Sequence, residues 1–341
     1  MSRLIQAVFV FVVIAFTLGL YCERQLRRPI SMPESSFYEV SRGEALSSVS
    51  DRLIADSIVT APAIVFKIYG LLTRYEGTIK AGEYRLTGDL TARSLLKLLR
   101  DGRVAQREIA FPEGWNFSQW RQHLLENEFL EHQMGDDSEQ LIMKRLKSRA
   151  NSAEGQFFPD TYLFSRGASD LSILQRAHER MYAVLDKEWA ENDTGTVLNN
   201  RQELLVLASI VEKETGYEPD RTLIASVFLN RLSKGMKLQS DPTVIYGSRE
   251  YSGDLKRSHL KQRTPYNTYV IKGLPPTPIC NPGLASIQAT LNPAASNYLY
   301  FVARGDGTSQ FSSSLAEHNA AVTRYQKTGR VEQYRSSPSR D

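Results

Sequence analysis

The sequence has few of the residues from which metal centres and disulfides are built. Among 341 residues there are two cysteines, Cys22 at the edge of an apolar run and Cys280 in a proline-rich loop. They define no disulfide framework and no zinc site. The five histidines are scattered without the short spacings that metal ligands need. We therefore expect no bound metal, and the sequence reveals no cofactor.

A strong excess of charge of one sign is also missing. The 42 basic and 38 acidic residues give a net charge of +4 and are well mixed along the chain. Because no dense basic stripe is present, we expect no nucleic-acid partner. Hydrophobic residues make up 41% of the sequence, which is enough for real cores in two domains, or in one large domain plus a small one.

One long hydrophobic run is present at the N-terminus. Residues 4–21 carry no charge. A helix rises by about 1.5 Å per residue, so this run just spans the hydrocarbon core of a membrane. A cleaved signal peptide would have a shorter apolar region that ends in a small-x-small site, which Gly19-Leu20-Tyr21 does not offer. We predict that residues 1–22 contain an uncleaved transmembrane anchor and that a linker follows over 23–36.

The rest of the chain predicts an α+β fold with two domains. Between residues 37 and 109, a short strand is followed by two helical patterns, a turn into a second strand, and a third helix that Thr91 opens and that stops at Gly102. This strand-helix-helix opening loosely resembles a LysM-type glycan-binding module, although a structural spacer fits equally well. We assign residues 110–327 to a larger mixed domain and 328–341 to a polar tail that we expect to be disordered.

The larger domain contains an apolar helix that delivers two glutamates at its end, LLVLASIVEKETG over residues 204–216. On a helix, Glu214 falls on the stripe of Leu207, Ile210 and Val211, whereas Glu212 falls on a weaker apolar stripe. Partial burial and the negative end of the helix dipole both raise the pKa of a carboxyl there, which can make a proton donor near neutral pH. From this segment alone, two ordinary surface charges remain the simpler interpretation.

Polar and aromatic loops surround this helix in the sequence. A second apolar helix follows it after Pro219, and Asp241 then lies in an Asp-Pro-Thr turn, where we expect it to cap a helix rather than to act as a second catalytic carboxylate. The aromatic-rich loop over 154–162 could stack on sugar rings or fill a core. Proline-rich loops over 264–269 and 273–283 carry tyrosine and amide groups suited to neutral, hydroxyl-rich ligands.

Taken in order, these blocks resemble the endolytic murein transglycosylases, the YceG-like family. The resemblance covers residues 37–327 and is carried by the following segments: AGEY at 81–84, FPEGW at 111–115, EGQFFPDTY at 154–162, LASIVEKETG at 207–216, ASVFLNRLSKGMKLQSDPTVIYG at 225–247, TPYNTY at 264–269, GLPPTPICNPG at 273–283, and YLYFVARGDG with the later EHN. Gln156-Phe157 and Cys280 depart from the pattern, and both departures lie outside the glutamate block in the sequence.

The resemblance implies an inner-membrane, single-pass protein with a LysM-like small domain and a catalytic domain in the periplasm. Charge counting alone would slightly favour a cytoplasmic body, because Arg24, Arg27 and Arg28 follow the apolar run and only Arg3 and the terminal amine precede it. The implied substrate is a nascent peptidoglycan glycan strand, and peptidoglycan synthases (penicillin-binding proteins) are the implied partners.

The resemblance also assigns the catalytic acid to the second glutamate of the EKET block, Glu214. The implied reaction cleaves the β-1,4 bond between N-acetylmuramic acid and N-acetylglucosamine, leaves a 1,6-anhydro end and limits strand elongation. It needs one carboxyl group and no cofactor. As hypotheses for substrate binding and transition-state stabilisation we name polar residues from the neighbouring family-like blocks: Glu212, Gln239, Ser240, Asp241, Tyr266 and Asn267.

Three questions stay open at the level of the sequence. Glu212 could be a solvated partner of a basic group, or its charge could keep Glu214 protonated. An inverting hydrolase would use Glu214 as the acid and Asp241 to activate water, with the two carboxyls about 6.5–9.5 Å apart. A non-catalytic, membrane-tethered glycan-binding scaffold is the third interpretation.

Overall fold

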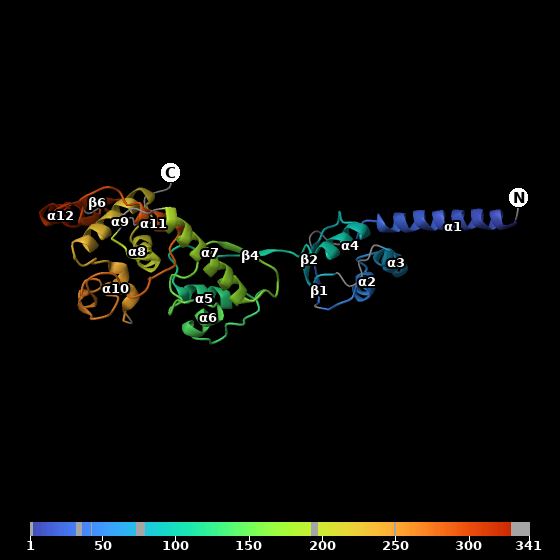
Figure 1. Cartoon of the computed structure of the whole chain (residues 1–341), viewed down its shortest axis with the longest axis horizontal. Coiled ribbons are helices and arrows are strands. Elements are labelled where there is room, and N and C mark those ends of the chain that lie inside the picture. Colours follow the sequence, from blue (N-terminus) through green and yellow to red (C-terminus); the bar gives the residue numbers. More distant parts are fainter. Residues whose placement is uncertain are drawn as a thin grey trace. The chain divides into compact units, whose positions relative to one another are not determined.

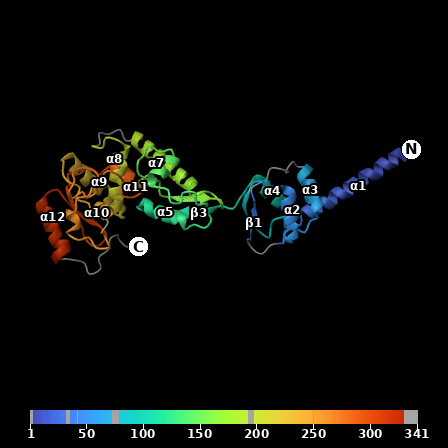
Figure 2. The same ribbon diagram turned by 90° about the horizontal axis from the view of Figure 1, so that it is seen from below.

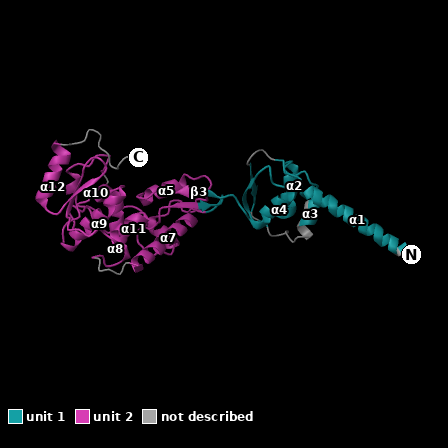
Figure 3. Cartoon of the chain, turned by 90° about the horizontal axis from the view of Figure 1, so that it is seen from above, with its two compact units in different colours: residues 1–108, 163–168 teal, residues 109–162, 169–341 magenta. Residues whose placement is uncertain are grey.

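The computed structural model describes residues 3–31, 36–41, 43–72, 79–191, 197–248 and 250–328 (Figure 1). The chain divides into two compact units, one formed by residues 1–108 with 163–168 and the other by 109–162 with 169–341 (Figure 3). The chain passes between them in strands β3 (Arg107–Ala110) and β4 (Thr161–Phe164), which pair in a two-stranded sheet. Most of the expected polar tail, residues 329–341, lies outside the described residues.

The N-terminal run forms helix α1 (Arg3–Leu26). Its part 5–26 is long and apolar enough to cross a membrane, and the most apolar stretch of 18 residues within it is not buried in the protein. The helix continues beyond the expected boundary at residue 22, and its last residues are buried. Leu26 and Ile30 are buried in the core of the first unit, and the N–H of Ile30 donates to the carbonyl of Leu90. The segment expected to be a linker therefore begins as packed structure, and residues 32–35 of it lie outside the described part.

The first unit is a small mixed core behind α1. Strand β1 (Ser36–Val40) pairs antiparallel with β2 (Gly82–Leu86), with Tyr38 opposite Tyr84. Helices α2 (Leu46–Ala55) and α3 (Ala63–Leu72) lie between these strands in the sequence, and α4 (Ala92–Asp101) follows. A capping box at Thr91 begins α4 and the left-handed Gly102 ends it, as the sequence predicts.

The second unit is mainly helical (Figure 2). Its elements are α5 (Phe117–Leu125), α6 (Glu139–Arg145), α7 (Asp170–Glu191), α8 (Arg201–Glu214), α9 (Glu218–Ser233), α10 (Asp241–Gly247), α11 (Leu284–Leu291), the antiparallel hairpin of β5 (Tyr300–Ala303) and β6 (Ser309–Ser312), α12 (Leu315–Val322), and two short turns at His259–Lys261 and Thr323–Thr328. Helices α7, α9, α10 and α11 all contact α8. The mixed α+β class is thus as predicted.

Helix α8 lies at the centre of the second unit rather than on its surface. Every residue from Leu204 to Val211 is buried, and α9 is buried from Ile224 to Leu229. A helix covered on all sides has no solvent face. The two carboxyls of Glu212 and Glu214 therefore differ in environment because of the loops that meet the end of α8. The apolar stripes of an amphipathic helix do not explain this difference.

Candidate active site

Helix α8 ends where its last three residues reach three different segments of the chain. The backbone of Thr215 is extended, which ends α8. Helix α9 begins at Glu218, with Pro219 in its first turn. Glu212 accepts the backbone N–H of Gly283 at 3.0 Å, and the Nζ of Lys213 donates to the carbonyl of Gly114 at 3.3 Å. Glu214 accepts the hydroxyl of Ser240 at 2.5 Å. These contacts make the end of α8 the junction of three loops.

The surroundings of the Glu214 carboxyl favour its protonated form. The residue as a whole is half-buried. Burial of the carboxyl raises its pKa to about 7, and the negative charge of Asp241 acts in the same direction. The hydrogen bond from Ser240 and the charge of Arg231 lower the pKa, but they do not offset the burial. The protonated form of Glu214 is therefore present near neutral pH, where an ordinary glutamate is ionised.

The partner of Glu214 is held by a well-bonded loop. Ser240 is 1% exposed, its N–H donates to Oγ1 of Thr268 at 2.9 Å, and its carbonyl accepts the hydroxyl of Thr243 at 2.7 Å. Gln239, just before it, has a φ of +53°, which is uncommon for a residue with a side chain. This left-handed residue turns the chain immediately before Ser240, and the Gln239 side chain stays exposed.

Asp241 does not cap a helix, contrary to the prediction. It is the first residue of α10, after an N-cap at Ser240 whose side chain makes no cap hydrogen bond because its hydroxyl is bonded to Glu214. The Asp241 carboxylate instead accepts the hydroxyl of Tyr269 at 2.6 Å. Its charge is close enough to Glu214 to raise the pKa of that carboxyl. Asp241 and Tyr269 therefore lie at the site.

Asn267 and Tyr266 organise the loops behind the site. Asn267 is fully buried, and its Nδ2 donates to the carbonyls of His259 at 3.1 Å and Gln262 at 2.7 Å, while its Oδ1 accepts the N–H of Tyr269 at 3.0 Å. Its amide is thus used inside its own loop, which leaves it unavailable to a ligand. The hydroxyl of Tyr266 lies 2.8 Å from that of Thr277 and links two proline-rich loops.

Glu212 makes a contact that the sequence did not suggest. It caps the backbone N–H of Gly283, the residue that precedes α11. Its negative charge raises the pKa of Glu113, where burial is the larger cause and Arg221 opposes both. The like charge that raises the pKa of Glu214 is that of Asp241. Glu212 therefore anchors a loop at the end of α8.

Arg231 belongs to the site although the sequence analysis did not single it out. It is 6% exposed, its Nε donates to the carbonyl of Leu299 and its Nη1 to that of Leu238, both at 2.6 Å. Its guanidinium lies 5.3 Å from the ring centre of Tyr300. A charged residue inside the apolar run VFLNRL was the signal that could have identified it, because burial of an arginine requires partners.

The aromatic loop over 154–162 fills the core instead of facing a ligand. Phe157, Phe158 and Tyr162 are 0%, 7% and 6% exposed. The same loop contains a second buried acid, Glu154, which accepts the Tyr246 hydroxyl and the N–H of Phe117, each at 3.0 Å. Burial raises the pKa of Glu154 to about 7. A carboxylate shortly before the aromatic pair Phe157-Phe158 was the sequence signal for it.

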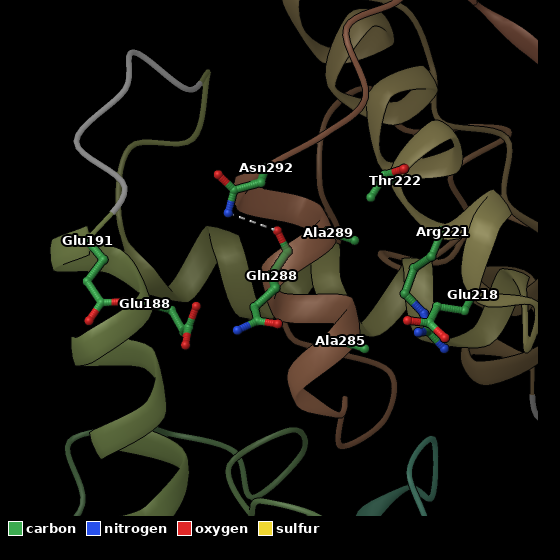
Figure 4. A pocket seen from close by; sticks show the side chains of 9 residues that line it. All are labelled: Glu188, Glu191, Glu218, Arg221, Thr222, Ala285, Gln288, Ala289 and Asn292. Carbon is green, nitrogen blue, oxygen red and sulfur yellow. Dashed lines mark hydrogen bonds between the residues drawn. The ribbon is translucent and has the colours of Figure 1, made fainter.

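A cavity of about 510 Å³ lies over α11, and Glu214 is not among its lining residues (Figure 4). Glu188 and Glu191 of α7 border it on one side, Glu218 and Arg221 of α9 on the other, and Gln288 rises from α11 between them. Within the described residues, no group of three His, Cys, Asp or Glu side chains is placed to hold a metal ion.

Comparison with known proteins identifies similarity over most of the chain. The profile of the YceG-like family matches residues 38–324. The endolytic murein transglycosylase of Bacillus subtilis is 28% identical over 308 residues, which cover 84% of this chain and 83% of that protein. The endolytic murein transglycosylase of Streptococcus pneumoniae serotype 2 is 28% identical over 299 residues, 77% of this chain and 53% of that protein, so the chain spans about half of its length.

A solved structure is also similar. The 2.6 Å crystal structure of a YceG-like protein of Listeria monocytogenes shares 30% sequence identity and superposes with a TM-score of 0.54 over 84% of this chain and 98% of that one.

Proposed function

This chain belongs to the YceG-like family, and on that premise we propose that it is an endolytic peptidoglycan transglycosylase. The enzyme cleaves the β-1,4 bond between N-acetylmuramic acid and N-acetylglucosamine inside nascent glycan strands and leaves 1,6-anhydro-muramic ends. The observation that carries the proposal is the carboxyl of Glu214, which accepts a hydrogen bond from Ser240 and has a pKa raised to about 7.

In the first step Glu214 acts as general acid. Its protonated carboxyl gives a proton to the glycosidic oxygen as the bond from that oxygen to C1 of the muramic residue breaks. A carboxyl with a pKa of about 7 suits this step, because the best general acid has a pKa near the pH at which the enzyme works.

In the second step the Glu214 carboxylate acts as base. It takes the proton of the muramic C6 hydroxyl while O6 closes onto C1, so that the proton lost in the first step is regained and no water is consumed. Because the nucleophile belongs to the substrate, a second carboxylate to activate water is not required.

The developing positive charge at C1 needs a negative partner. Asp241 is the candidate, since its carboxylate already acts on Glu214 and is oriented by the hydroxyl of Tyr269. Ser240 holds the Glu214 carboxyl in place, and the exposed Gln239 next to it is a candidate for binding sugar hydroxyls. Tyr266 and Asn267 position the surrounding loops.

The proposal includes a membrane anchor. The apolar helix α1 supports a single pass through the inner membrane, with the catalytic unit in the periplasm beside peptidoglycan synthases. The strand-helix-helix-strand order of the first unit supports a LysM-like module. Fusion of a reporter that is active only in the periplasm to the C-terminus tests the orientation, and an inactive fusion would contradict it.

Product analysis tests the reaction. The full-length protein in detergent is incubated with un-crosslinked nascent glycan strands, and the products are identified by mass spectrometry. We expect internal cleavage with 1,6-anhydro ends. Reducing ends would instead indicate the inverting hydrolase with Asp241 as base, and binding without cleavage would indicate a scaffold.

A further inference from the structure

Helix α1 is joined to the first unit without a loose connection. Gln25 and Leu26 at its end are buried, and so is Ile30 four residues later. The N–H of Ala92 donates to the carbonyl of Arg28, which ties the exit of the helix to the start of α4. If α1 crosses the membrane, as the proposed function requires, the first unit is therefore held directly at the membrane surface.

Helix α3 lies beside the end of α1. Cys22 of α1 and Tyr69 of α3 both pack against the core of the first unit. The guanidinium of Arg93 pairs with Glu23 and lies 5.4 Å from the ring centre of Tyr69. Figures 1–3 show α3 on the side of the unit from which α1 leaves. Tyr69 is thus at the level of Glu23, the first charged residue after the apolar run.

At this level α3 exposes large apolar side chains. Ile64 is 61% exposed and Ile68 is 41% exposed, and residues four apart share one face of a helix. Val65, on another face, is 3% exposed and belongs to the core. The apolar face is therefore not needed for the packing of the first unit, and an exposed apolar face at one site points to a partner.

The surroundings of α3 match a lipid surface. Arg24, Arg27 and Arg28 are exposed at the end of α1 and can interact with anionic lipid headgroups. Tyr69 with its polar tip lies where aromatic side chains gather at membrane interfaces. A pair of isoleucines offers neither the flat aromatic faces nor the polar groups that bind a sugar, whereas it fits the acyl boundary.

We propose that α3 is an interfacial helix that lies on the leaflet from which α1 emerges, with Ile64 and Ile68 in the lipid. The proposal rests on the proposed membrane anchor. It implies that the first unit faces the bilayer through α3, so that only its other surfaces are open to glycan.

The depth of a tryptophan at position 68 tests the proposal. Full-length Ile68→Trp is reconstituted in phosphatidylcholine–phosphatidylglycerol vesicles with and without brominated phosphatidylcholine, which quenches tryptophan in the lipid. The matched control is Phe37→Trp, because Phe37 is 52% exposed in the same unit but on β1. The unsubstituted chain measures the quenching of its three tryptophans. Circular dichroism checks that both variants fold.

We expect the fractional loss of emission from Trp at position 68 to be at least about twice that at position 37, since an interfacial helix buries its apolar face by roughly 5–10 Å. Equal quenching at both positions would overturn the inference while leaving the anchor intact. Flotation of the same vesicles separates the two cases, because a chain that does not float with lipid contradicts the anchor and the inference together.

Discussion

The hydroxyl of Ser240 donates a hydrogen bond of 2.5 Å to Oε1 of Glu214, 26 positions earlier in the chain. Burial raises the pKa of that carboxyl, and this bond lowers it. The acidity of Glu214 is therefore set by a balance between the loop that carries Ser240 and the packed end of α8. Substitutions that shift this balance should shift the pH dependence of cleavage in a predictable direction.

Glu214→Gln should abolish cleavage while the fold is kept. The amide is isosteric and can still accept the Ser240 hydroxyl, but it cannot donate an acidic proton. We expect a loss of at least about a hundredfold in turnover on purified glycan, the usual size of a general-acid contribution. Glu212→Gln is the control, because Glu212 is two residues away. If Glu212→Gln abolished lysis while Glu214→Gln retained it, the assignment of Glu214 as the catalytic acid would be wrong.

Ser240→Ala should move the alkaline limb of kcat/KM to higher pH. The hydrogen bond lowers the pKa of Glu214, so its loss lets the pKa rise and keeps the acid form present at higher pH. The rate should also fall by about tenfold or more, because the carboxyl loses its positioning donor. A pH–rate profile measures both effects, and an unmoved alkaline limb would show that Ser240 does not control the acid.

Asp241→Asn should move the same limb the other way. The charge of Asp241 raises the pKa of Glu214, so its removal lowers the pKa and shortens the range in which the acid is protonated. Asparagine can still accept the Tyr269 hydroxyl, which keeps the local contact. The products should retain anhydro ends. Reducing ends that form with the native protein and disappear in this variant would support water activation by Asp241 instead.

Glu154→Gln should stabilise the second unit at alkaline pH. The pKa of Glu154 is about 7 in the folded protein, whereas the ordinary glutamate value of 4.5 represents the unfolded chain. The folded state thus binds the proton more tightly than the unfolded state does. The stability of the native protein therefore falls as the pH rises from 4.5, the pKa in the unfolded chain, through about 7, the pKa in the folded protein. We expect the free energy of unfolding of the variant to exceed that of the native protein by about 1–3 kcal/mol at pH 8. The difference should vanish near pH 4, as denaturant unfolding at both pH values can show.

Gly155→Ala should destabilise the second unit more than Gly135→Ala does. Both glycines have positive φ, +76° and +47°. A Cβ at Gly155 would lie 2.4 Å from Cβ of Pro278, a rigid neighbour, whereas Gly135 has no atom within 4 Å of that position. Overpacking adds about 1–3 kcal/mol to the shared cost of the left-handed backbone. Equal losses in denaturant unfolding would show that the Pro278 loop moves aside.

Local patterns in the sequence determined much of this protein. The apolar run over 4–21, the cap at Thr91 and the stop at Gly102 each act within one element, so their periodicity and turn chemistry predict α1 and α4 correctly. The glutamates at the end of α8 were recognisable for the same reason. The mixed α+β class followed from the order of these elements.

Only the tertiary structure decided which groups meet at the end of α8. The sequence suggested an amphipathic helix, but α7, α9, α10 and α11 pack around α8 and bury it from Leu204 to Val211. Glu212 accepts a hydrogen bond from Gly283, 71 residues away, and Glu214 accepts one from Ser240. The amide of Asn267 forms its hydrogen bonds within its own loop. The pKa of a carboxyl depends on the burial and the charges that such long-range packing brings to it, and periodicity along one helix does not contain that information.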